Sequence, residues 1–123
     1  MNEAPLVSIV DDDASVREAL ADLFESSGLR TRTFDCAQEF LNAAVAESCQ
    51  CIVSDIQMPG MTGIELSRHL RAEAVRTPII LISAYATDPV RRSAEAIGVT
   101  CVLAKPFDPM ELLACVESVL PPQ

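Results

Sequence analysis

Five side chains that could take part in chemistry stand at the ends of four short apolar segments of this chain. Two acids follow the first segment, one acid ends the second, a hydroxyl ends the third and an amine follows the fourth. Because the carboxyl ends of parallel strands meet at one edge of an open α/β sheet, where ligands bind, we expect these side chains to converge. In chain order they are Asp11, Asp12, Asp55, Ser83 and Lys105.

Three carboxylates held close together repel one another, and either a raised pKa or a bound divalent cation relieves that repulsion. The three acids carry a formal charge of −3 and the lysine +1, so Mg²⁺ would neutralise the site. Oxygen ligands suit Mg²⁺, with Mn²⁺ as a substitute, better than they suit zinc. With a cation bound, Asp55 could attack a phosphoryl group while Ser83 and Lys105 stabilise its oxygens. The product would be an aspartyl phosphate.

The composition indicates a single acidic domain over residues 1–123, long enough to bury about two-thirds of its unfolded surface. A net charge of −9 and a pI near 4.4 argue against direct nucleic-acid binding, which needs clustered Lys and Arg. Five cysteines lack the paired spacing of a zinc site, and four lie among apolar neighbours, which predicts buried reduced thiols. The sequence shows no signal peptide and no apolar run of about 18 residues, so we expect a cytoplasmic protein without membrane contact.

Short apolar runs alternate with helical patterns along the chain, which predicts a parallel sheet with crossover helices. Five such units can be counted, giving a (βα)5 arrangement. Residues 29–34 alternate apolar and polar side chains as an edge strand would, whereas residues 79–82 are apolar on both faces and should be central. A third helix is expected over residues 64–73, before Thr77-Pro78 stops it.

Helix ends carry their own sequence signals. Asp13 and Asp108 stand where N-caps of the first and fifth helices are expected. Asp35, with Gln38 three residues later, predicts a capping box for the second helix. Gly98 stands where the fourth helix should close.

In this order and on these strand ends, the residues resemble the receiver domain of bacterial two-component response regulators, over about residues 5–120. The resemblance implies a flavodoxin-like, doubly wound sheet with strand order 2-1-3-4-5. The spacing is most similar to the FixJ-type branch, whose receivers usually precede a helix-turn-helix output domain. Residues 121–123 could then begin a linker to a DNA-binding output domain outside this chain. The motifs are Val10-Asp11-Asp12, Asp55-x-x-Met58-Pro59-x-Met61-x-Gly63, Ser83-Ala84 and Lys105-Pro106-Phe107.

The resemblance implies that Asp55 accepts a phosphoryl group from a sensor histidine kinase. Asp11 and Asp12 would hold Mg²⁺ together with Asp55 and the main-chain carbonyl of Gln57. Phosphorylation would change the surface of the fourth helix, fifth strand and fifth helix, which in similar receivers carries homodimer or output contacts. The expected output is transcriptional. Such a domain is not an enzyme in the ordinary sense, although it catalyses its own phosphoryl transfer and autodephosphorylation.

In similar receivers the hydroxyl at Ser83 and the amine at Lys105 contact the phosphoryl group, and the bond before Pro106 is usually cis. One residue departs from the family pattern. Val102 stands where an inward-turning Tyr or Phe is common, so a rotating ring cannot report phosphorylation here. We therefore expect the loop over residues 84–89 and the start of the fourth helix to move instead.

Two residues of that loop, Ala84 and Tyr85, are expected at the rim of the site. The single histidine, His69, is expected to be a solvated helix residue.

Other functions stay open at this point. The chain could be a stand-alone relay or a receiver-like interaction module that is never phosphorylated. More remotely, Asp11 could be the nucleophile of a phosphohydrolase of the haloacid dehalogenase type, because residues 11–13 fit its Asp-x-Asp pattern.

Overall fold

The computed structural model describes residues 4–121, in which strands and helices alternate without exception. This confirms the five units predicted from the apolar periodicity. The strands are β1 (Leu6–Val10), β2 (Arg30–Phe34), β3 (Cys51–Asp55), β4 (Ile79–Ser83) and β5 (Cys101–Ala104), and the helices are α1 (Ala14–Ser26), α2 (Ala37–Ala43), α3 (Gly63–Ala72), α4 (Asp88–Ile97) and α5 (Pro109–Val119).

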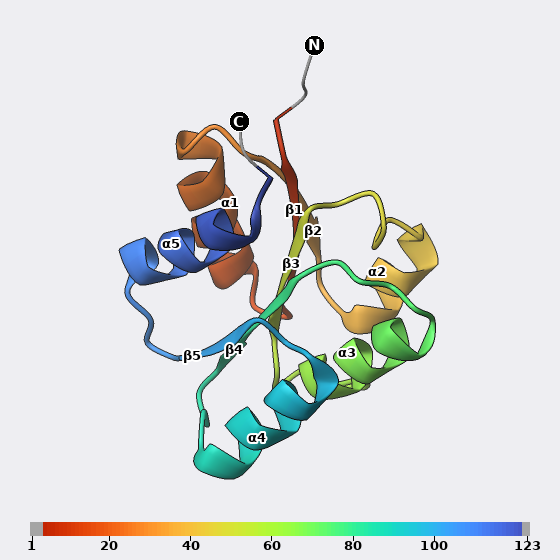
Figure 1. Ribbon diagram of the computed structural model, residues 1–123. Helices are drawn as coiled ribbons and strands as arrows, with labels where there is room; N and C mark the ends of the chain where they lie inside the picture. The colour runs from red at the N-terminus through yellow and green to blue at the C-terminus, as the bar shows by residue number, and fades with distance from the viewer. Residues whose placement is uncertain (1–3, 122–123) are drawn as a thin grey trace.

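The strands form one parallel sheet in the predicted order, β2-β1-β3-β4-β5. Helices α1 and α5 cover one face of the sheet, and α2, α3 and α4 cover the other (Figure 1). The edge position predicted for the second strand is confirmed, because β2 pairs only with β1 and is the most exposed strand. The sheet is therefore doubly wound, and all five strands end at the same edge.

Two apolar cores, one on each face, hold the sheet between its helices. Side chains alternate between them along a strand, so that Ile79 and Leu81 of β4 join one core while Ile80 and Ile82 join the other. All five residues of β4 are buried, as the continuous apolar run predicted. The largest fully buried helix side chains are Leu20, Phe24 and Leu112 on one face, and Phe40, Leu66 and Leu70 on the other.

The predicted N-caps of α1 and α5 are confirmed. The Asp13 carboxylate accepts from the main-chain N–H of Ser15 at 2.8 Å, and the Asp108 carboxylate accepts from that of Met110 at 2.9 Å. Helix α4 closes at Gly98 in the left-handed conformation, with φ of 86°.

The capping box predicted at residues 35 and 38 is wrong. Helix α2 begins one residue later than that pattern requires, with Cys36 at the N-cap and no side-chain cap. Gln38 then lies at the second helical position, from which its side chain donates to Asn42 at 2.9 Å. The capping box lies instead at α3, where the Thr62 hydroxyl accepts from the Glu65 N–H at 3.1 Å and the Glu65 carboxylate accepts from the Thr62 N–H at 2.9 Å.

The cysteines within the described residues are all free thiols, as predicted, but only Cys49 and Cys51 are buried. Helices long and apolar enough to cross a membrane are absent between residues 4 and 121. The linker expected over residues 121–123 falls outside the described residues, except for its first residue.

Gly63 opens α3 against the end of β3, and a Cβ there would overlap the Asp55 carbonyl oxygen and lie 3.1 Å from the Ile56 Cα. We expect Gly63→Ala to lower the free energy of unfolding by about 2–3 kcal/mol, because backbone must move to admit the methyl group. Gly28→Ala is the matched control: its φ of +86° is unfavourable for alanine but nothing lies within 4 Å. That change should cost only about 1 kcal/mol. Urea unfolding of both variants measures the difference, and equal losses would contradict the close contact.

Candidate functional site

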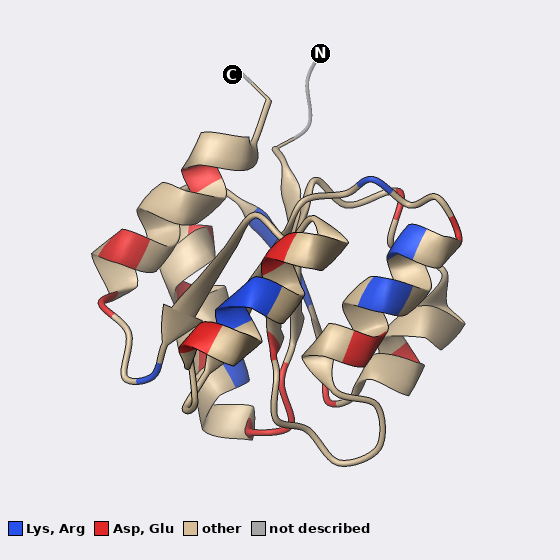
Figure 2. Ribbon diagram, turned by 60° about the horizontal axis from the view of Figure 1, so that its bottom comes forward, with Lys and Arg blue, Asp and Glu red and all other residues tan. Residues whose placement is uncertain are grey.

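Acidic and basic side chains from three strand ends meet at the carboxyl edge of the sheet. The Lys105 ammonium lies after β5 and donates to Asp55 Oδ2 at 3.2 Å and to Asp11 Oδ2 at 3.5 Å. Asp12 completes the group, since one carboxylate oxygen from each of the three acids lies within 4.8 Å of the others. Figure 2, with this edge turned forward, shows acidic segments at the ends of the central strands. The predicted convergence of acids and amine is therefore observed.

Asp11 is fixed from several sides. Its main-chain N–H donates to the Phe34 carbonyl at 3.1 Å, and its carbonyl accepts from the Arg17 guanidinium at 2.7 Å. Its Oδ1 accepts from the Asp13 N–H at 2.9 Å, which turns Oδ2 toward Lys105. The residue is buried, whereas Asp12 beside it is exposed. Asp11 thus offers an oriented carboxylate and Asp12 a solvent-facing one.

Asp55 is the last residue of β3 and is 6% exposed. Its Oδ1 accepts from the Gln57 N–H at 3.3 Å while Oδ2 faces Lys105. The next residue, Ile56, donates its N–H to the Ile82 carbonyl at 2.9 Å, so the backbone stays paired with β4 past the strand end. Sheet pairing therefore fixes the carboxylate at the mouth of the site.

Burial and charge act on the ionisation of these groups. Burial raises the pKa of the Asp11 carboxyl above its ordinary value, and the Asp55 charge adds to this, against the opposing effects of the Asp13 N–H and Lys105. Burial alone would lower the pKa of the Lys105 ammonium, but the Asp11 and Asp55 carboxylates raise it overall. One ammonium leaves the acids incompletely neutralised. An all-oxygen cluster with a net negative charge fits a divalent cation such as Mg²⁺.

Ser83 ends β4 and is fully buried. Its hydroxyl donates to the Gln57 side-chain oxygen at 2.9 Å and accepts from the Tyr85 main-chain N–H at 2.9 Å. The sequence placed Ser83 at this edge correctly but gave no sign of the contact with the Gln57 side chain. Asp55 pairs in register with Ile82, and this pairing brings the residues after the two strands side by side. Register was the signal that could have found the contact.

The remaining predicted residues lie around the rim and beneath it. Ala84 and Pro106 are exposed, Tyr85 is 67% exposed, and the Lys105-Pro106 bond is cis as expected. Val102 is buried under α4.

Arg91 is a residue that the sequence did not single out. Its guanidinium donates to the Val102 carbonyl at 2.7 Å and to the Ala86 carbonyl at 3.2 Å. This one side chain joins α4, β5 and the loop that follows β4.

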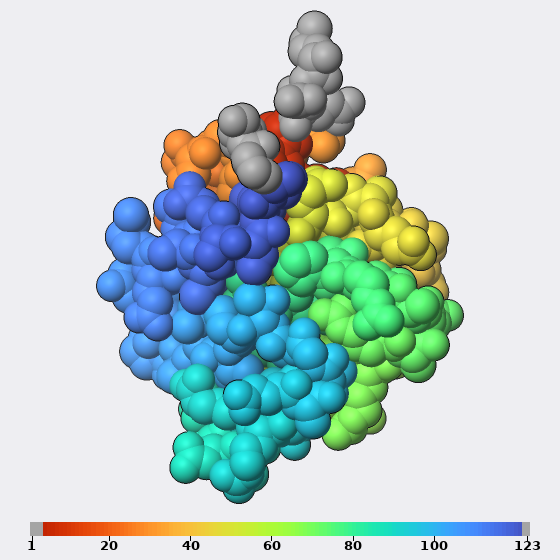
Figure 3. Space-filling model, in the orientation of Figure 1, coloured from red at the N-terminus to blue at the C-terminus, as the bar shows by residue number. Residues whose placement is uncertain are grey.

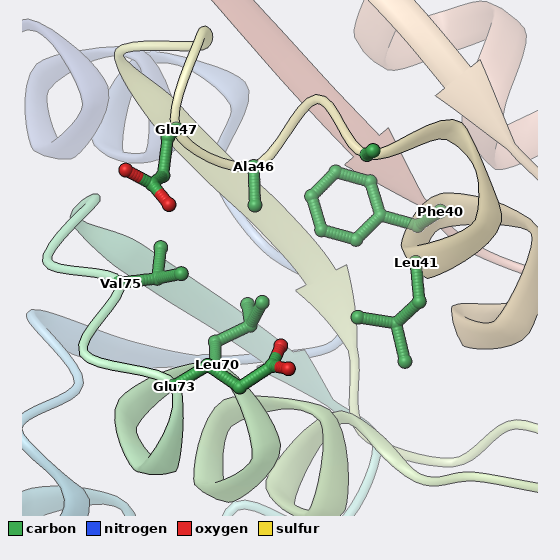
Figure 4. Close-up of a pocket in the computed structure, with 8 residues that line it drawn as sticks. Phe40, Leu41, Ala46, Glu47, Leu70, Glu73 and Val75 are labelled. Atoms are coloured by element: carbon green, nitrogen blue, oxygen red, sulfur yellow. The ribbon is translucent and has the colours of Figure 1, made fainter.

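Two other features lie apart from the acids. His69 is an exposed residue of helix α3, as predicted, and lies 3.1 Å from the Glu73 carboxylate. A hollow of about 330 Å³ lies between α2 and α3, lined by apolar side chains with Glu47 and Glu73 at its rim (Figure 4). Val75 and Ala46, which line it, precede β4 and β3. The hollow is therefore at the opposite edge of the sheet from the acids.

The sequence model of the family described as response regulator receiver domain matches residues 7–117. The transcriptional regulatory protein FixJ of Bradyrhizobium diazoefficiens is 37% identical over 114 residues, covering 93% of this chain and 56% of FixJ. The chain thus spans just over half the length of this curated relative.

Solved structures agree with the sequence matches. The response regulator StyR is 43% identical with a TM-score of 0.88, over 95% of this chain and 59% of StyR. The chemotaxis protein CheY4 of Vibrio cholerae is 30% identical with a TM-score of 0.87, over 95% of this chain and 99% of that chain. The chain is thus similar both to part of longer regulators and to the whole of a shorter protein.

The crowding of carboxylates leads to a prediction about stability. Asp11→Asn should raise the free energy of unfolding by about 0.5–2 kcal/mol in metal-free buffer near neutral pH, because it removes a buried charge that faces Asp55. Adding Mg²⁺ should reduce the difference, since wild-type protein gains from binding that the variant loses. The exposed Asp12 supplies the control: Asp12→Asn should change metal-free stability less. Chemical unfolding with and without Mg²⁺ measures both, and a less stable Asp11→Asn protein in metal-free buffer would contradict the electrostatic account.

Proposed function

The chain belongs to the family of response regulator receiver domains, and on that basis we propose that it accepts a phosphoryl group on Asp55 from a sensor histidine kinase. A receiver of this family is a signalling domain rather than an enzyme in the ordinary sense. One observation carries the assignment to Asp55: its carboxylate, at the end of β3, lies 3.2 Å from the Lys105 ammonium within a three-acid cluster. Asp11 belongs to the same cluster and also contacts Lys105, but at 3.5 Å, and it follows β1 with only 1% of its surface exposed, whereas Asp55 is the last residue of β3 and is 6% exposed.

Asp11, Asp12, Asp55 and the main-chain carbonyl of Gln57 would hold Mg²⁺, or Mn²⁺ in its place. When bound, the cation would offset the carboxylate charges and those of the phosphoryl oxygens. Asp55 then forms a bond from a carboxylate oxygen to phosphorus as the bond from phosphorus to the donor histidine nitrogen breaks. The electron pair of that bond stays with the nitrogen. Lys105 turns its ammonium toward a phosphoryl oxygen, and the surrounding carboxylates keep that ammonium charged.

Return to the resting state needs only water. A water molecule adds to phosphorus, the bond to the Asp55 oxygen breaks, and inorganic phosphate leaves with Asp55 again a carboxylate. We infer that the domain carries out this autodephosphorylation itself.

The signal leaves the site through residues 84–89 and α4. Val102 provides no ring to turn inward, so the movement falls to this loop, whose Ala86 carbonyl is held by Arg91. Arg91 also binds the Val102 carbonyl, and a change in the loop would therefore reach β5. Segments of α4, β5 and α5 form a continuous surface on one face (Figure 3, teal to blue). We infer that this surface carries homodimer or output contacts.

The output we propose is control of transcription by a DNA-binding domain linked to this one, within the cytoplasm. The relatives support this: FixJ is named a transcriptional regulatory protein, and the matched region covers 56% of it. A stand-alone relay is the second candidate, favoured by the match to 99% of CheY4. The sequence of the gene around this segment distinguishes the two.

Phosphorylation provides the direct test. Incubation with acetyl phosphate and Mg²⁺ should add one phosphoryl group, found by mass spectrometry of borohydride-trapped peptides on Asp55. Asp55→Asn should lose the modification essentially completely. Asp22→Asn, which changes an exposed carboxylate in the middle of α1, is the control and should react as wild type. Modification at Asp11 instead would support the phosphohydrolase hypothesis. The absence of any modification would support an interaction module that is never phosphorylated.

A second experiment follows the movement of the loop. Beryllofluoride, a phosphoryl mimic, should shift NMR signals across residues 84–97 as well as those of the site, through a coupling of about 1–3 kcal/mol. Arg91→Ala should confine the shifts to the site, since it removes both links to the Ala86 and Val102 carbonyls. The neighbouring Arg92→Ala is the matched control. If the NMR signals of residues 84–97 do not shift in the wild type, the loop does not carry the signal.

A further inference from the structure

The Ser83 hydroxyl has one proton, and in this structure that proton is already engaged. It is donated to the Gln57 side-chain oxygen at 2.9 Å. The same hydroxyl oxygen accepts from the Tyr85 main-chain N–H at 2.9 Å. A serine hydroxyl offers a single donor, so it cannot serve a second acceptor at full strength.

We propose that the Gln57 side chain is a positioning residue that holds the Ser83 hydroxyl in the resting arrangement and thereby lowers the affinity of the site for a phosphoryl group. This inference rests on the proposed function of Asp55. Phosphoryl oxygens near neutral pH are acceptors, and Ser83 can stabilise one only by giving it its proton. The bond to Gln57 must therefore break first.

Gln57 is well placed for this because it is bound to both partners of the switch. Its main-chain N–H donates to Asp55 Oδ1 at 3.3 Å, while its side chain reaches Ser83. The first contact fixes the start of the side chain beside the proposed phosphoacceptor. The second spans from the end of β3 to the end of β4. One residue thus joins the carboxylate that would be modified to the hydroxyl that would respond.

The cost of releasing the hydroxyl is modest on the Gln57 side. Gln57 is exposed, so its freed amide can bond to water, whereas Ser83 is fully buried and needs a protein or phosphoryl partner. A neutral hydrogen bond with such a solvated partner shifts an equilibrium by about two- to tenfold. Gln57 therefore sets a small threshold that phosphorylation can overcome.

The same release would carry the loop with it. The lone pair of Ser83 that binds the Tyr85 N–H is free to keep that contact when the proton turns toward another acceptor. Tyr85 would then follow the hydroxyl. In this way one change of hydrogen-bond partner would initiate the movement of residues 84–89.

The affinity for beryllofluoride in the presence of Mg²⁺ tests the inference. Gln57→Met keeps the length of the side chain and the main-chain carbonyl but removes the acceptor. It should bind beryllofluoride about two- to tenfold more tightly than wild type, measured by NMR titration. Spectra of the free variants establish that each is folded.

A double-mutant cycle with Ser83→Ala separates this role from a general effect of the substitution. In the Ser83→Ala background there is no proton to hold, so Gln57→Met should leave the affinity unchanged. Unchanged or weaker binding by Gln57→Met alone overturns the inference, as does an equal gain in both backgrounds. Absence of beryllofluoride binding to the wild type would instead refute the proposed role of Asp55.

Discussion

Repulsion between carboxylates at one edge of a parallel sheet is the constraint on which the rest of the site depends. Parallel pairing brings the ends of β1 and β3 together, and with them Asp11 and Asp55. Lys105 offsets part of their charge from the end of β5. Two apolar cores hold the strands in register, so the acids cannot move apart to relieve the repulsion. The energy of packing in this way maintains a cluster of oxygen ligands whose net negative charge fits a divalent cation.

The sequence was sufficient to predict the strands and helices and the convergence of the acids, because both predictions rest on local patterns. The apolar run of β4 predicts a buried strand, and an acid before an apolar helix, as at Asp13, predicts an N-cap. The second helix shows the limit of such patterns. Residues 35 and 38 have the spacing of a capping box, but α2 starts one residue later than that box requires. The spacing alone does not determine which residue is the N-cap.

The contacts of Gln57 with Ser83 and of Arg91 with Val102, which the sequence did not predict, are both tertiary. Gln57 reaches Ser83 only because β3 and β4 are neighbours, and Arg91 reaches Val102 only because α4 packs on β5. Neither residue has a periodicity or a spacing that marks its partner. Their side chains are long, and several rotamers of each would satisfy the local backbone equally well. Which hydrogen-bond partner each one finds is decided by the assembled fold.

The close approach of Gly63 to the Asp55 carbonyl has a mechanical consequence. The start of α3 touches the end of β3 and is held by its own capping box, so it forms a rigid support on one side of the acids. On the opposite side, Ser83 is bonded to the exposed Gln57 side chain, and the loop before α4 is tied to that helix by the side chain of Arg91, so this side yields more easily. A change at Asp55 is therefore expected to displace the residues on the side of Ser83 and α4 rather than those of α3. The rigid contact between α3 and β3 thus gives movement at the site a preferred direction.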